Sequence, residues 1–215
     1  MGYLEESLKT YSDALASGGP TPGGGSAAAL VGALGAALNS MVANFTVGRE
    51  KFAAVDAQAR DLLAESEHLR ADLERLTQAD TEAYAQVSAA YKMPRDTDEE
   101  KAVRQDAIQQ ALKAAAQVPM EAVRACHRVL EIANELLAVG NPNLITDVGV
   151  AARFALAALE CATLNAEINL IHIKDRSYVE ASFDSMKPLL AEGERLGRDV
   201  WRAVIQKVRE GVSKK

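Results

Sequence analysis

The chain has 215 residues, of which 48% are hydrophobic and 25% charged, and its formal charge is −6 at pH 7. This composition predicts one globular domain spanning residues 1–215. An acidic chain offers no basic stripe for phosphates, so the charge balance argues against a nucleic-acid partner and against a membrane surface. The N-terminus lacks the features of a signal peptide. The two distant cysteines, Cys126 and Cys161, predict buried free thiols in a reducing cytoplasm.

The first predicted helix covers about Tyr3 to Ala16 and stops at a glycine pair. A turn rich in proline and glycine follows it, containing Pro20, Pro22, Gly23, Gly24 and Gly25. The prolines fix the backbone angle φ, and the glycines permit a close approach that any Cβ would prevent.

Ser26 follows this turn and is predicted to be the N-cap of the next helix. The turn would then expose backbone N–H groups at a helix N-terminus, which suit a carboxylate, a phosphate or another electron-rich ligand atom. A tight turn between helices, with no ligand, explains the same residues equally well. Neither a phosphate-binding lysine motif nor a preceding strand is present, so the turn does not match a nucleotide-binding fingerprint.

The helix after the turn carries no charged residue between Ala14 and Gly48, a length that could span a membrane. Its alanine and glycine content, interrupted by Asn39, Ser40 and Asn44, instead favours a buried helix at the centre of a bundle.

The remaining chain predicts four more helices, with no alternating strand pattern between them. The fourth helix begins with the capping box of Thr97 and Glu100, and Pro119 is expected to kink or break it. We therefore expect an all-α, single-domain bundle of about six helices around the Ala/Gly-rich central helix. The later helices are expected over about Ala53–Tyr91, Thr97–Val139, Thr146–Lys174 and Val179–Gly211.

Two charged side chains lie in apolar seams. Asp80 falls in the three-and-four spacing of the third helix, and Arg104 heads the corresponding seam of the fourth. A carboxylate facing a core is costly unless it is paired, caps another helix or serves a site. Arg104 could pair with a carboxylate of the protein or of a ligand, or could simply extend its stem along the surface.

Asp147 is predicted in the first turn of the fifth helix, where the helix dipole keeps a carboxylate ionised. Capping alone would also explain it. Asn165, Asn169 and His172 continue on the same side of this helix. Asn165 lies eighteen residues further along, about 27 Å away, so the two cannot contact one small group unless a second subunit or a long ligand connects them.

No metal site is expected from the sequence. Glu65 and His68 form a single Glu-x-x-His pair, whereas a di-iron bundle needs two such pairs and two further glutamates. The three histidines, His68, His127 and His172, show no ligand spacing. No pattern typical of an acyl-transfer nucleophile is present.

Several blocks resemble, in the same order, the cyclodeaminase/cyclohydrolase family. The family comprises the formimidoyltetrahydrofolate cyclodeaminase domain and the stand-alone methenyltetrahydrofolate cyclohydrolases. The resemblance runs from about Pro20 to Leu170, and Thr146 departs from it where the family usually has serine. The blocks are PTPGGGSAAALVGALGAALNSMVANFT, GREKF, DTEAYAQV, PRDTDEEKAVRQDAIQQAL, VP, GNPNLITDVGVAA and NAEINL.

The resemblance implies an all-helical, homodimeric, cytoplasmic enzyme that acts on folate and needs neither a metal nor a further cofactor. Both family reactions pass through a tetrahedral carbon between N5 and N10 of tetrahydrofolate, and both need a carboxylate to stabilise a cation and move a proton. Asp147 is the first candidate for this acid and Asp80 the second. The expected substrate-binding residues are Pro22, Gly23, Gly24, Gly25 and Ser26 of the turn, with Arg49, Lys51 and Arg104 as cations for the glutamate tail.

The chain carries no formiminotransferase domain, and its charged blocks favour the cyclohydrolase over the cyclodeaminase. The cyclodeaminase remains the alternative. A non-catalytic helical protein that binds folate or a partner helix is a further one, since the packing faces are rich in alanine and histidine is scarce.

Overall fold

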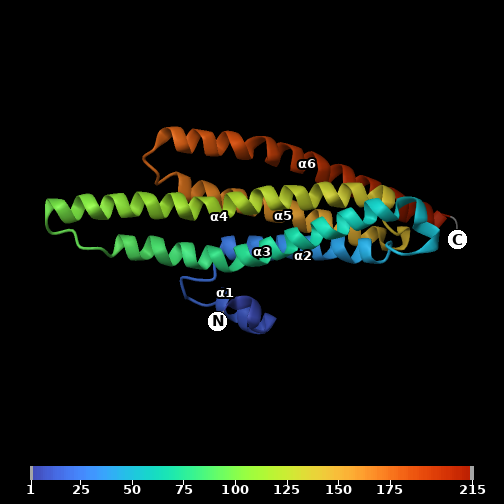
Figure 1. The fold of residues 1–215 in the computed structure, drawn as a ribbon, viewed down its shortest axis with the longest axis horizontal. Helices are drawn as coiled ribbons and strands as arrows, with labels where there is room; N and C mark the ends of the chain where they lie inside the picture. Colours follow the sequence, from blue (N-terminus) through green and yellow to red (C-terminus); the bar gives the residue numbers. More distant parts are fainter. Residues whose placement is uncertain (1, 214–215) are drawn as a thin grey trace.

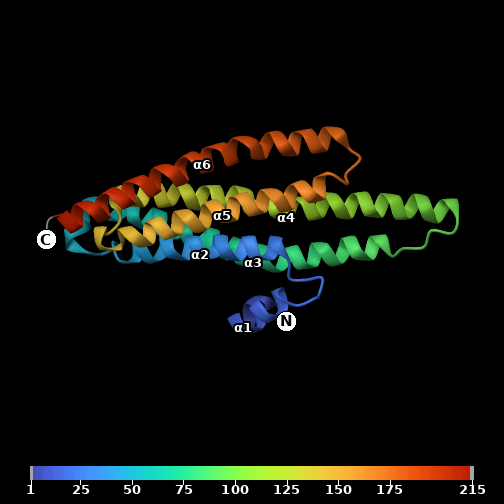
Figure 2. The ribbon, with the colours of Figure 1, turned by 180° about the vertical axis from the view of Figure 1, so that it is seen from behind.

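The computed structural model describes residues 2–213, with side chains described up to residue 210. Within that range the chain is helical, and the long helices run roughly along one axis (Figures 1 and 2). This confirms the predicted all-α bundle. The α-helices are α1 (Leu8–Leu15), α2 (Gly24–Asn44), α3 (Asp56–Tyr91), α4 (Asp98–Val139), α5 (Ile145–Leu170) and α6 (Arg176–Ser213), and the short 3-10 turns are η1 (Tyr3–Glu5), η2 (Glu50–Val55) and η3 (Pro142–Leu144).

Helix α2 packs against α3, α4 and α5, as predicted for the central helix. Its small residues allow this closeness: a Cβ added to Gly32 would lie 2.7 Å from Cys126 Sγ of α4. By length and composition α2 could cross a membrane, but 61% of its most apolar window is buried inside the protein. The burial is that of a core helix.

Helix α5 runs antiparallel to α2. Gly24, at the start of α2, lies beside Asn165 near the end of α5, and Gly35 lies beside Ala151 and Phe154 near its beginning. A Cβ on Gly35 would come within 3.2 Å of the Ala151 carbonyl oxygen. Helix α6 covers α4 and α5 on the other side, and the short α1 lies at the edge of the bundle, where its Tyr11 contacts the start of α2 (Figures 1 and 2).

Several boundaries differ from the prediction. The first helix is divided into η1 and α1, because Ser7 is extended and accepts a hydrogen bond from the Thr10 N–H as N-cap. The third helix begins later, at Asp56, after η2. The fifth ends earlier, at Leu170, and the last begins at Arg176.

The predicted capping box of Thr97 and Glu100 is confirmed. Pro119 does not break α4, which continues through it to Val139. The proline itself is buried in the core side of the helix.

Candidate functional site

Helix α2 begins three residues earlier than predicted, within the glycine turn. Gly23 is the N-cap, with extended backbone angles of φ −122° and ψ −165°, and Gly24 is the first helical residue. The prediction that Ser26 is the N-cap is therefore wrong. Ser26 lies fully buried in the first turn, where its N–H donates to Asp80 Oδ2 over 2.9 Å. A carboxylate from α3 thus serves the α2 N-terminus that a serine hydroxyl was expected to serve.

Asp80 lies directly against the turn. A Cβ on Gly25 would collide with the Asp80 carboxylate, so only glycine allows α3 to approach here. Burial raises the pKa of Asp80, and the hydrogen bond from the Ser26 N–H opposes this only in part. The charged residue in the apolar seam therefore caps another helix, and its carboxyl group has a pKa above the usual value.

A cavity of about 440 Å³, the Gly24–Asp80 cavity, opens beside Asp80 and the turn. Gly23, Gly24 and Gly25 form one wall and Asp80 another. This size suits a drug-sized ligand held between helices. The remaining lining residues are Pro20, Thr21, Ala83, Tyr84, Val87, Tyr91, Leu112, Ala115, Asn165, Ile168, Asn169 and His172.

The amides of α5 complete the polar side of the cavity. Asn165 Nδ2 donates to the Cys161 carbonyl over 2.8 Å, and its Oδ1 lies 3.5 Å from the place of a Cβ on Gly24. Asn169 Nδ2 donates to the Asn165 carbonyl over 3.1 Å. These bonds fix the two amides at the edge of the cavity.

The N-terminal segment holds the turn from outside. Tyr11 Oη lies 3.1 Å from Ser26 Oγ, and Tyr3 Oη donates to the Thr21 carbonyl over 3.2 Å. Pro22 is buried behind the turn, and Thr21–Pro22 is a cis peptide bond. Pro22 and Ser26 therefore support the cavity wall without lining it.

Arg104 is not one of the residues that line the cavity, but it contacts Tyr91, which does. Its guanidinium donates to the Tyr91 carbonyl over 3.0 Å and stacks on the Tyr91 ring, whose centroid is 5.7 Å from Cζ. It thus satisfies the C-terminal end of α3 and positions an aromatic wall of the cavity.

Asp147, Arg49 and Lys51 lie at the opposite end of the bundle. Asp147 occupies the first turn of α5, as predicted, and is half-buried. Arg49 and Lys51 follow the end of α2 and are exposed. Because the twenty steps of α2 from Gly24 to Asn44 rise about 30 Å, one chain does not bring these residues to the Gly24–Asp80 cavity.

The residues missed in the sequence are aromatic. Tyr84 and Tyr91 line the cavity although each is almost half exposed, at 48% and 47%. Their spacing of seven residues on one helix places them on one face. That face lies beside the seam of Asp80, which is the signal that could have identified them.

Glu65 and His68 do not form a metal site. Glu65 is bound by both arms of Arg128, over 2.6 and 2.7 Å, and the His68 side chain is 77% exposed. Cys126 is buried as predicted, and burial raises its pKa to about 12, which makes it a poor nucleophile. Cys161, predicted to be buried, is exposed instead.

Cys161 belongs to an uncharged face on the outside of α2 and α5. On each of the two helices, the residues of this face recur every three or four positions and so form one stripe along the helix. In the α5 stripe, Leu164 is 66% and Ile171 59% exposed. The stripes lie side by side because α2 and α5 pack together. The uncharged face comprises Ala27, Val31, Leu34, Leu38 and Met41 of α2 with its C-cap Phe45, and Val150, Phe154, Ala157, Cys161, Leu164 and Ile168 of α5 with its C-cap Ile171.

Comparisons with known proteins point to one family. The sequence model of the formiminotransferase-cyclodeaminase family matches residues 7–187. The methenyltetrahydrofolate cyclohydrolase of Methylorubrum extorquens is 43% identical over 94% of this chain and 98% of its own length. The rat formimidoyltransferase-cyclodeaminase is 34% identical over 89% of this chain but only 35% of its own length. The crystal structure of formiminotetrahydrofolate cyclodeaminase from Thermotoga maritima is 32% identical, superposes with a TM-score of 0.80, and covers 97% of this chain and 98% of its own.

Proposed function

Because the chain belongs to the formiminotransferase-cyclodeaminase family, we propose that it is a methenyltetrahydrofolate cyclohydrolase. It would hydrolyse 5,10-methenyltetrahydrofolate to 10-formyltetrahydrofolate in one-carbon metabolism. The observation that carries this proposal is the Gly24–Asp80 cavity, where a carboxyl group with a raised pKa lies beside a helix N-terminus. Sequence identity favours the cyclohydrolase, since the Methylorubrum cyclohydrolase is 43% identical to this chain and the Thermotoga cyclodeaminase is 32% identical.

The chemistry needs a base and then an acid on one side of the one-carbon bridge. Water attacks the cationic methenyl carbon, and Asp80 takes a proton from that water. The neutral hydroxyl intermediate then collapses: its O–H proton passes to N5, the N5–carbon bond breaks, and the formyl group stays on N10. One proton is released overall. Because the substrate is itself an electrophilic cation, the step needs no metal and no further cofactor.

The cavity supplies the groups that hold such a substrate. The Asn165 and Asn169 amides and the backbone of Gly23, Gly24 and Gly25 suit the polar edge of a pteridine. Tyr84 and Tyr91 offer ring faces for the aromatic part of folate.

We further propose that two copies pack through the uncharged face to form a homodimer. A contiguous apolar surface of this kind marks an interaction site, and a two-fold interface uses the same patch of both copies. The exposed stripe of α5 runs from Val150 to Ile171, so its midpoint is Cys161. A two-fold axis that passes near Cys161, perpendicular to the face, makes the two α5 helices antiparallel.

This antiparallel dimer would bring Asp147, Arg49 and Lys51 of one chain to the Gly24–Asp80 cavity of the other. Asp147 precedes Cys161, the midpoint of the exposed stripe, by fourteen residues, so it would lie opposite the end of the partner's α5, beside the partner's Gly24–Asp80 cavity. Arg49 and Lys51 lie at the same end as Asp147 and would supply cations for the glutamate tail of the partner's substrate. Asp147 would then stabilise the methenyl cation while Asp80 moves the proton.

Engineered disulfides test the direction of the helices. In a Cys161→Ser background, Val150→Cys combined with Ile171→Cys should cross-link two chains on oxidation, because antiparallel helices bring these positions together. Val150→Cys alone should not cross-link. Cross-linking of the Val150→Cys single variant would instead show parallel helices and refute the shared site.

A two-substrate assay tests the activity. Purified protein should remove the methenyl absorbance of 5,10-methenyltetrahydrofolate and should release no ammonia from 5-formiminotetrahydrofolate. Ammonia release would identify the alternative, a cyclodeaminase, which is favoured by the Thermotoga structure. Loss of neither substrate would leave a non-catalytic folate-binding protein. The proposed place of action is the cytoplasm, which holds the folate pool and keeps Cys161 reduced.

A further inference from the structure

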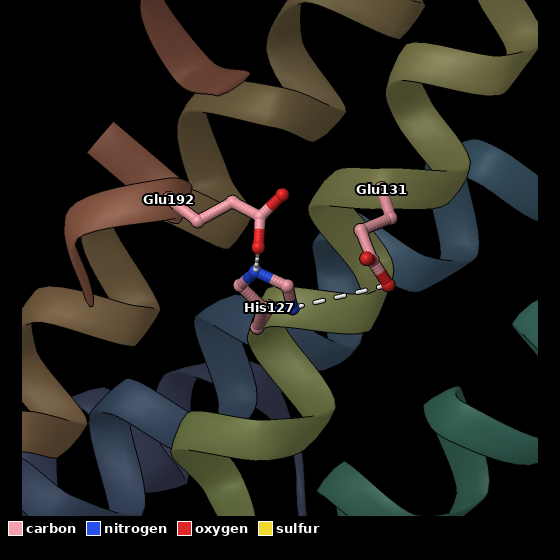
Figure 3. A group of neighbouring side chains, drawn as sticks. All are labelled: His127, Glu131 and Glu192. Atoms are coloured by element: carbon pink, nitrogen blue, oxygen red, sulfur yellow. Dashed lines mark ion pairs between the residues drawn. The ribbon is translucent and has the colours of Figure 1, made fainter. Parts of the chain in front are cut away.

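His127 of α4 is a buried imidazole between two carboxylates. Its side chain is only 8% exposed, and Nε2 makes no hydrogen bond. Nε2 faces Glu192 Oε2 of α6 over 3.5 Å, and Nδ1 faces Glu131 Oε2 of α4 over 3.8 Å. Figure 3 shows both carboxylates turned toward the ring, one from each helix. A buried ring nitrogen without a hydrogen bond, aimed at a carboxylate, is a costly arrangement when nothing else binds there.

The charges around the imidazole leave the carboxylates only partly compensated. Arg128 contacts Glu131 over 3.2 Å but shares its single charge with two other glutamates, of which Glu65 binds it more closely. Arg195 contacts Glu192 over 3.4 Å and also Asp199 over 3.2 Å. The group as a whole keeps an excess of negative charge, which favours a cation.

We propose that His127, Glu131 and Glu192 form a binding site for a divalent cation of the zinc class. One ligand atom from each residue lies within 4.8 Å of the other two. Zinc binds nitrogen and oxygen ligands at about 2.0–2.2 Å, which sets neighbouring ligands about 3.3 Å apart. The separation between His127 Nε2 and Glu192 already fits. Glu131 faces Nδ1 in the structure, so its carboxylate must rotate toward Nε2 to become the third ligand. Imidazole nitrogen and carboxylate oxygen are both ligand types that zinc accepts, and water can complete the four-coordinate shell.

The ion would be structural. His127 lies twelve residues along α4 from Ala115 of the Gly24–Asp80 cavity, about 18 Å away. It would join α4 to α6 where α6 also packs closely against α5, since a Cβ on Gly193 would collide with Leu159. This inference does not rest on the proposed function, and it adds no metal to the folate chemistry.

Zinc titration of the full chain tests the site. Calorimetry with Zn²⁺ should show one ion per chain, and Zn²⁺ at about 100 times its Kd should raise Tm by about 5 to 10 °C. His127→Gln should abolish both signals. His68→Gln is the matched control, because His68 also faces a carboxylate one turn away, Asp72 over 3.4 Å, but lies at the surface with no second helix. Its zinc response should equal that of the wild type.

A second variant guards against a folding defect in His127→Gln. Glu192→Gln changes a half-exposed side chain of α6 and should weaken Zn²⁺ binding at least tenfold while the apo protein keeps its Tm. Zn²⁺ should also slow amide exchange in α6 around Glu192. No zinc response in the wild type, or equal responses in wild type, His127→Gln and Glu192→Gln, would overturn the proposal. A chelator should leave folate turnover unchanged. Loss of turnover in the presence of the chelator would contradict the structural role of the ion.

Discussion

The two carboxylates expected to act, Asp80 and Asp147, lie at opposite ends of the bundle in opposite surroundings. Asp80 lies in the middle of a long helix, half-buried, and closes a cavity beside a helix N-terminus. Asp147 lies in the first turn of its own helix, near the exposed cations Arg49 and Lys51. The contrast shows that one chain builds only part of the expected site. The uncharged face between the two ends explains how a second chain could complete it.

The largest expected effect comes from Asp80→Asn. The amide keeps an oxygen for the Ser26 N–H and nearly the same volume, so the fold should persist, but it cannot accept a proton from water. We expect kcat/KM for methenyl hydrolysis to fall about 10²- to 10⁴-fold. Turnover followed by methenyl absorbance, with Tm as the folding control, checks this. Wild-type turnover would remove Asp80 from the chemistry.

Leu164→Glu tests the link between the two ends. A carboxylate at this exposed, apolar position should be tolerated by a monomer but not inside a dimer interface. Sedimentation should show monomers, and turnover should fall at least tenfold because each cavity loses the partner's Asp147. Leu8→Glu is the matched control, since Leu8 of α1 is even more exposed, at 82%, and lies outside the uncharged face. A Leu164→Glu variant that is monomeric and fully active would show that turnover does not need the partner's Asp147.

Gly25→Ala should disturb only the cavity end. The added methyl collides with the Asp80 carboxylate and must push α3 away from α2. We expect a loss of about 1–3 kcal/mol in the free energy of unfolding, together with weaker turnover. Urea unfolding measures the first. Gly18→Ala, where a Cβ meets nothing within 4 Å, should be close to neutral. Equal stability of the two variants would mean that Asp80 does not press against the turn.

A smaller effect concerns pH. The pKa of Asp80 is raised in the folded state by burial, so the folded protein binds its proton more tightly than the unfolded chain does. This contribution to stability is fully present below the unfolded pKa, near 3.9, and is lost as pH rises through the folded pKa. The stability of the wild type relative to Asp80→Asn should therefore decrease from about pH 4 toward neutral. Parallel stability curves for the two proteins would contradict a raised pKa.

Local signals predicted much of this structure. The capping box of Thr97 and Glu100 and the helical spacing that placed Asp80 in a seam act over one to a few turns, and both are confirmed. The identity of the α2 cap was not readable in this way, because the group that binds the Ser26 N–H comes from a residue 54 positions away. Long-range partners of this kind leave no local pattern.

The exposed apolar stripe shows a second limit. Cys161 and Leu164 follow the same spacing as core residues, so the sequence alone does not tell a face that packs inside the chain from one left open. His127 and Glu192 show the same difficulty for a polar group, since they meet only because α4 and α6 pack together. The sequence placed each residue on its helix, and the packing of the helices decided what each residue meets.

Mixing two inactive variants tests the shared site most directly. Asp80→Asn and Asp147→Asn should each be nearly inactive as pure dimers, because every site then lacks one carboxylate. After unfolding and refolding an equal mixture, half of the dimers are mixed, and each mixed dimer has one intact site. We expect about a quarter of the wild-type turnover to return. If the mixture stays as inactive as its components, or if Asp147→Asn alone keeps wild-type turnover, the two carboxylates do not act together across a dimer.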